Sequence, residues 1–62
     1  MSSTYDKFAT AWVEHYYFGT HSSYLAAARA EMLGSPDYDE NKHRKALEES
    51  RRVLSMLRHL LA

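Results

Sequence analysis

The stretch His43–Leu61, HRKALEESRRVLSMLRHLL, repeats with a period of seven residues. The positions of its apolar stripe recur every three or four residues, which predicts an amphipathic helix. The stripe comprises Leu47, Leu54 and Leu61, then Ser50 and Leu57, then Ala46, Val53 and Leu60. It is about 140° wide, more than a two-stranded coiled coil needs, and the repeat is shorter than three heptads. We therefore expect one side of a bundle core, with helix pairing across a dimer axis as the alternative. The candidate core or dimer seam is Leu47, Leu54, Leu57 and Leu61.

Two shorter helices are predicted upstream of this stretch. The first is expected at about residues 4–18, because Ser3 and Asp6 are spaced as a capping box and Gly19 suits a left-handed helix end. Its apolar face is Tyr5, Phe8, Ala9, Trp12 and Tyr16. The second is expected at about residues 22–33, where an alanine run favours helix, and Gly34 should end it in the same way.

Ser35-Pro36 should break the chain before the third helix. Asp37 and Glu40 have the spacing of a cap and its capping-box partner, so this helix is expected at about residues 37–61. We thus predict an all-α fold in a single domain, residues 1–62: a three-helix bundle-like arrangement of two short helices and a long C-terminal one.

The predicted lengths leave part of the third helix without a neighbour. Helices of roughly 14, 12 and 24 residues would be about 21, 18 and 36 Å long. The overhang should be either the polar stretch 39–45, exposed to solvent, or a surface covered by a second chain. A chain of 62 residues also buries little apolar area. We therefore expect a homodimer formed through helix packing.

Composition excludes several classes of protein. The chain has no cysteine, so it contains no disulfide and no thiolate metal site. No apolar run approaches the roughly 20 residues that span a bilayer, and Met1–Asp6 does not resemble a signal peptide, so we expect a cytoplasmic protein without membrane contact. Neither a phosphate-binding glycine loop nor a histidine metal motif occurs. We expect no enzyme, no cofactor and no metal.

An aromatic cluster near the first turn is one candidate binding surface. Tyr17 and Phe18 lie off the apolar face of the first helix, and Tyr24 follows shortly after the turn. Aromatic side chains give large contact areas and dominate binding hot spots. We predict that Tyr17, Phe18 and Tyr24 form a partner-binding patch, or else a small satellite core under the turn.

Arginines on the third helix are the other candidate binding surface. Residues 1–41 carry a net charge of −4 and residues 42–62 a net charge of +4, so the neutral total conceals two opposed blocks. Arg44, Arg51 and Arg58 form one line of the repeat, and Arg52 flanks them. This basic stripe could bind an acidic protein or phosphates, or it could be paired with glutamates four residues away and with the acidic upstream helices.

These features predict a small non-enzymatic protein-binding regulator, an adaptor or inhibitor that docks on a larger protein, as many short bacterial and phage chains do. The alternative is a small DNA- or RNA-associated regulator that uses the basic C-terminal helix. A helix-turn-helix reader is disfavoured, because Asp37, Asp39 and Glu40 at the start of the third helix would repel phosphates.

Overall fold

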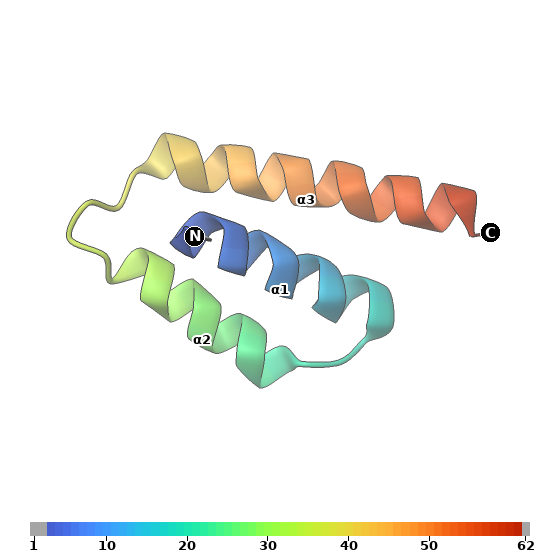
Figure 1. Cartoon of the computed structure of the whole chain (residues 1–62), viewed down its shortest axis with the longest axis horizontal. Coiled ribbons are helices and arrows are strands. Elements are labelled where there is room, and N and C mark those ends of the chain that lie inside the picture. Colours follow the sequence, from blue (N-terminus) through green and yellow to red (C-terminus); the bar gives the residue numbers. More distant parts are fainter. Residues whose placement is uncertain (1–2, 62) are drawn as a thin grey trace.

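The structure, a computed structural model, describes residues 3–61 and contains three helices in that range and no strand. Helix α1 spans Thr4–Phe18, α2 spans Ser22–Leu33 and α3 spans Glu40–Leu60 (Figure 1). The predicted all-α fold is therefore confirmed. None of these helices is both long enough and apolar enough to cross a membrane.

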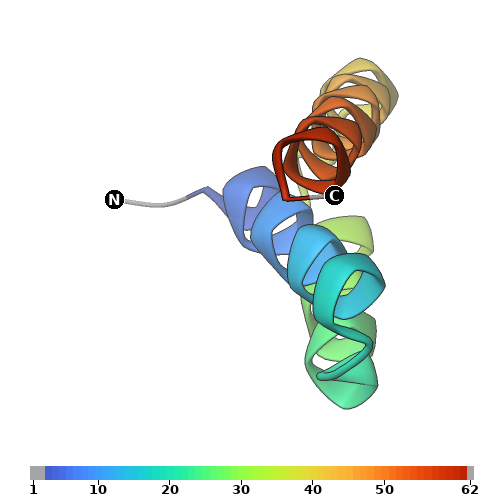
Figure 2. The same cartoon turned by 90° about the vertical axis from the view of Figure 1, so that its right-hand side faces the viewer.

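Helix α1 is the central element of the fold. It packs against both α2 and α3, whereas no α-carbon of α2 lies within 8 Å of one of α3. Figure 2 shows α2 and α3 diverging on different sides of α1. The expectation of a bundle is met only in part, because a closed bundle would bring all three helices together. The arrangement is open, and α1 alone holds it.

The core is small and centred on the ring of Phe8. Its buried members come from α1 and α2: Phe8, Ala11, Leu25, Ala28 and Met32. Tyr5, Trp12, Tyr38, Ala46 and Leu47 are half-buried against it. The Phe8 ring meets the His43 ring edge-on at 5.2 Å, and the Arg29 guanidinium lies 5.9 Å from its centroid. Phe8 therefore touches side chains from both outer helices.

The ends of α1 follow the sequence signals. Ser3 caps the helix with its hydroxyl, which accepts from the Asp6 N–H at 3.1 Å, and the Asp6 carboxylate accepts from the Ser3 N–H. Gly19 ends the helix in the left-handed conformation, with φ of 71°. His21 then adopts φ of 61°, which is unfavourable for a residue with a Cβ atom, and caps α2 without a side-chain hydrogen bond.

One predicted cap conformation and one predicted helix start were wrong. Gly34 ends α2 with φ of −87°, not in the left-handed region. Helix α3 begins at Glu40, and its cap is Asp39 rather than Asp37. The reason is a contact distant in sequence: the Asp39 N–H donates to the hydroxyl of Tyr5 on α1, at 2.7 Å. That bond holds Asp39 in an extended conformation and delays the helix.

Ser50 lies at a close contact between α1 and α3. It is only 1% exposed, its hydroxyl donates to the Ala46 carbonyl at 2.7 Å, and the same oxygen lies 3.4 Å from the carbonyl of Ala9. A small side chain at this position lets the two backbones come together. Helices α1 and α3 run in the same direction here (Figure 1).

The overhanging part of α3 is the opposite end from the one expected. His43, Ala46 and Leu47, near its start, pack against α1, whereas Leu60 and Leu61, at its end, are 71% and 68% exposed. Of the two alternatives for the overhang, the one that placed it at residues 39–45 was wrong, because the turn before α3 is anchored on α1.

We predict that replacing Ser50 with leucine destabilises the fold by about 1–3 kcal/mol or more, because the larger side chain forces α1 and α3 apart. Urea denaturation followed by circular dichroism measures this change. Ser50→Ala is the control and should cost less than about 1 kcal/mol, since both carbonyl oxygens keep other partners. Equal effects of the two substitutions would contradict the close approach.

Candidate protein-interaction surface

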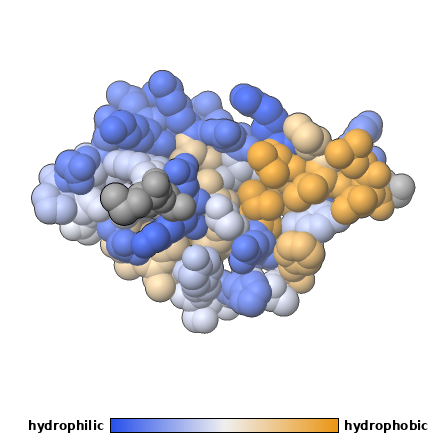
Figure 3. All heavy atoms as spheres, in the orientation of Figure 1, coloured by the Kyte–Doolittle hydropathy of each residue, from blue (hydrophilic) through white to orange (hydrophobic). Residues whose placement is uncertain are grey.

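Several apolar side chains are exposed on the C-terminal half of α3. Val53, Met56 and Leu60 are exposed, and Leu57 beside them is half-buried. These four residues are called the C-terminal apolar patch below. Figure 3 shows apolar side chains gathered over this end of α3. Contiguous apolar surface on a small protein commonly marks an interaction site.

A shallow groove between α1 and α3 adjoins the C-terminal apolar patch and shares Val53 with it. Its apolar lining comes from Ala9 and Val13 on α1 and from Ala46 and Val53 on α3. Acidic side chains also line it, namely Asp6, Glu14 and Glu49, together with Thr10 and Ser50. None of the described residues that line the groove is basic. The groove thus offers an apolar surface with negative charge around it.

The seam predicted from the leucine repeat is divided between core and surface. Leu54 is buried and Leu47 is half-buried against the core, so both serve packing within the chain. Leu57 is half-buried, and Leu61 is exposed. The first leucines of the repeat therefore pack within the chain, whereas the last ones contribute to its surface.

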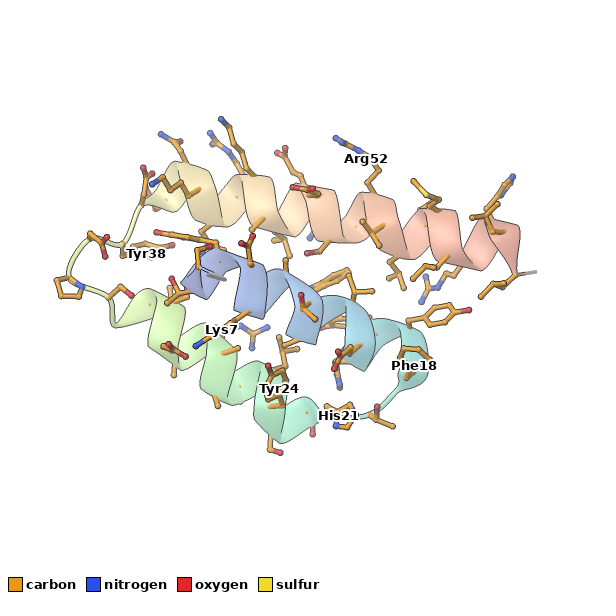
Figure 4. All side chains as sticks on the ribbon, in the orientation of Figure 1. Lys7, Phe18, His21, Tyr24, Tyr38 and Arg52 are labelled. Atoms are coloured by element: carbon orange, nitrogen blue, oxygen red, sulfur yellow. The ribbon has the colours of Figure 1, made fainter. Side chains whose placement is uncertain are left out.

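Arginines of the basic stripe occupy a different side of α3 from the groove. Arg51 and Arg58 line a hollow with Leu54, Ser55 and His59, and Arg44 lines another near Tyr38 and Leu47. Arg52 is separate from the other three and points away from α1 (Figure 4). The three arginines that are seven residues apart therefore follow one line along α3, and Arg52, which flanks them in the sequence, points to another side.

Of the alternatives for these arginines, pairing with glutamates four residues away is not seen in the structure. Within residues 3–61, the only ion pair closer than 4 Å joins Lys7 on α1 to Glu31 on α2, at 3.4 Å. Arg44 instead donates to the side-chain oxygen of Asn41, at 2.9 Å. The arginine side chains extend into solvent, and their charge is available to another molecule.

The predicted aromatic patch is not a single surface. Tyr17 and Phe18 meet edge-on with ring centroids 4.9 Å apart, and Phe18 is 65% exposed, whereas Tyr17 is half-buried. Tyr24 is exposed but lies well away from Phe18 (Figure 4). Phe18 shares a surface hollow with Glu14, Thr20 and the strained His21. Phe18 is the one strongly exposed aromatic ring of the three.

One pair of titratable side chains lies at the start of α3, where the Tyr38 hydroxyl and His43 Nδ1 are joined by a 2.6 Å hydrogen bond. Partial burial, and then the charge of Glu40, raises the pKa of Tyr38 above its ordinary value. Among residues 3–61, no group of three or more histidine and carboxylate side chains could hold a metal ion.

The sequence reasoning missed the groove and assigned Val53 and Leu60 to the core. The available signal was the width of the apolar stripe of α3, which exceeds what one neighbouring helix covers. Met56 and Val13 were not singled out at all, because neither lies on the expected core face of its helix. No family model, curated protein or solved structure matches this chain.

Leu54 and Leu61 share one position of the repeat but should differ in their effect on stability. We predict that Leu54→Ala, at a site 7% exposed, lowers the free energy of unfolding by about 2–5 kcal/mol. Leu61→Ala, at an exposed site, should change it by less than about 0.5 kcal/mol. Denaturation of both variants measures the difference, and a comparable loss from Leu61→Ala would show that the end of α3 is packed.

Proposed function

We propose that this chain is a small non-enzymatic protein-binding regulator that docks on an acidic surface of a larger protein through the basic stripe Arg44, Arg51 and Arg58. The observation that carries this proposal is the lack of a carboxylate within 4 Å of these arginines among residues 3–61. Positive charge that does not stabilise the fold is available for recognition. Arginine forks match the geometry of carboxylates.

The spacing of the stripe suits an extended partner surface. Residues seven apart in a helix are separated by about 10.5 Å, so Arg44 and Arg58 are about 21 Å apart. Leu54 lines the hollow beside Arg51 and Arg58, and Leu47 lines the hollow beside Arg44, so both hollows have an apolar floor. A row of carboxylates on a rigid protein surface could meet all three arginines at once.

Phe18 is a candidate anchor for the same regulator. It is exposed at the end of α1, next to His21, whose left-handed backbone is a strained feature of the kind found at functional sites. An exposed aromatic ring on a firm scaffold can fill a pocket of a partner with little loss of side-chain entropy. The two surfaces together favour a binding role.

A nucleic acid is the second candidate ligand for the basic stripe. It is the weaker candidate because Asp39 and Glu40 stand at the start of α3, and Glu48 lies within the helix beside Arg44. These carboxylates would repel a phosphate backbone, while a protein partner could place its charges between them. The zero net charge of the chain also gives little long-range attraction for nucleic acids.

Affinity capture from the native host tests the role of the stripe. We predict that the wild-type chain retains a protein partner after nuclease treatment, and that Arg51→Glu weakens capture at least about tenfold, as expected for a buried charge pair. Lys42→Glu makes the same change of charge on another side of α3 and should have little effect.

Two results would contradict this proposal. Loss of all captured material after nuclease treatment would identify a nucleic acid as the ligand. Equal weakening by Arg51→Glu and Lys42→Glu would show that only the overall charge matters. Circular dichroism of each variant verifies that the helices are retained.

Phe18→Ala provides a separate test of the aromatic anchor. We predict that it weakens capture of the same partner by about 2 kcal/mol or more, the range of interface hot spots. The thermal midpoint of the free chain should stay unchanged, because the ring is largely exposed. Tyr24→Ala, at an exposed ring on α2, is the matched control, and an equal loss from both would not fit a specific anchor.

A further inference from the structure

We infer that the partner segment recognised by the basic stripe is an acidic amphipathic helix, which lies on the side of α1 that α2 and α3 flank. This side is called the α2–α3 side below, and Figure 2 shows the two outer helices that bound it. Trp12 on α1 forms its floor, Arg29 on α2 lies at one edge, and Arg51 and Arg58 on α3 lie at the other. The inference rests on the proposed function and adds α1 and α2 to its binding site.

A row of three side chains from the three helices marks the α2–α3 side. The Phe8 ring of α1 has the Arg29 guanidinium of α2 at 5.9 Å from its centroid and meets the His43 ring of α3 at 5.2 Å. No α-carbon of α2 lies within 8 Å of one of α3. The two outer helices therefore approach α1 from this side without packing on each other.

The period of the α-helix places two arginines of the basic stripe on the same side. At 3.6 residues per turn, Arg51 and Arg58 are rotated from His43 by about 60–80° in one direction. Ala46 and Val53, which line the acidic groove, are rotated from it by about 60–80° in the other direction. Because His43 faces Phe8 and the groove opens on the far flank, the arginines lie on the flank nearer to α2.

Aromatic and apolar side chains on the α2–α3 side are only partly covered. Trp12 follows Phe8 by one turn of α1 and is half-buried against the core. Its ring centroid lies 4.5 Å from that of Tyr16, which is 47% exposed. Leu54 lines the same hollow as two arginines of the basic stripe. The side thus has an apolar floor between positively charged edges.

The acidic residues of α1 and α2 lie on other sides of these helices. Asp6 and Glu14 line the groove on the opposite flank of α1. Glu31 is two residues from Arg29, so it points about 160° away from it, and it pairs with Lys7 at 3.4 Å. Arg29 is exposed and has no carboxylate within 4 Å among residues 3–61. The α2–α3 side therefore presents arginines of two helices and is complementary to an acidic partner.

An amphipathic helix is the acidic segment that fits this arrangement. Strand addition needs a sheet edge, which residues 3–61 do not offer, whereas a helix can lay its apolar side on the floor between two other helices. Helices pack with their axes about 8–10 Å apart, so one helix contacts both α2 and α3 only where these two are not packed together. Carboxylates on either side of its apolar stripe then meet the arginines of both edges.

The fluorescence of Trp12, the sole tryptophan of the chain, tests this site. The probe is a synthetic helical peptide of about 21 residues, about 30 Å long, with leucines on one side and glutamates flanking them. We predict a blue shift of the emission, because the bound peptide removes the indole ring from water, and weaker binding at high salt. A peptide of the same composition, shuffled so that leucines occur on all sides, is the control and should not bind.

Variants of the chain place the peptide between α2 and α3. Arg29→Glu and Arg51→Glu should each weaken peptide binding at least about tenfold, because a carboxylate then faces the glutamates. Arg52→Glu makes the same change of charge at a residue that points away from α1, and should have little effect (Figure 4). Circular dichroism verifies the helices of each variant. If Arg29→Glu loses helical content, Arg29→Ala takes its place and should still weaken binding.

An unchanged Trp12 emission at millimolar peptide would overturn the inference. So would equal binding of the shuffled peptide, or undiminished binding to a folded Arg29 variant. These results leave the proposed function intact if Arg51→Glu still weakens capture of the host partner. A larger emission change with a single-stranded oligonucleotide than with the peptide would assign the site to a nucleic acid. Undiminished host capture by Arg51→Glu would instead contradict the proposed function, whatever the peptide does.

Discussion

Helix α1 is the only element that contacts both other helices, and the rest of the structure depends on this constraint. An amphipathic helix normally packs through one apolar side, but α1 must present two. It does so with small or flat side chains: Ala11 is buried within the core shared with α2, Ala9 lies against Ser50 of α3, and the Phe8 ring reaches side chains of both. The fold is consequently open, and its core is limited to what one short helix can cover.

Because α3 is longer than α1, part of its surface has no neighbouring helix. Anchored at its start by the contact of Tyr5 with Asp39, α3 continues past the end of α1, and its last turns have no neighbour in the chain. The C-terminal apolar patch and the arginines are thus separate surfaces of α3. The acidic groove is a third surface, which α3 shares with α1. The opposed charge blocks of the sequence become, in three dimensions, an acidic groove and a basic helix end. We propose that the line of arginines, on another side of α3, is available to another protein.

The three helices and most core positions could be predicted from the sequence, because spacing and capping are local properties. The capping box of Ser3 and Asp6 and the left-handed Gly19 are examples. The start of α3 could not be predicted, because it depends on the hydroxyl of Tyr5, more than thirty residues away. Whether the arginines are paired could not be decided from the sequence either, since i, i+4 spacing permits an ion pair without requiring one. Which part of the leucine repeat is exposed follows only from the relative placement of α1 and α3.

The central claim is that α1 alone holds α2 and α3 together, and the NOEs of the Phe8 ring test it most directly. We predict cross-peaks from this ring to the His43 ring on α3 and to the Arg29 side chain on α2. Cross-peaks to only one of the two outer helices, in a sample that retains its helical circular dichroism, would contradict the account.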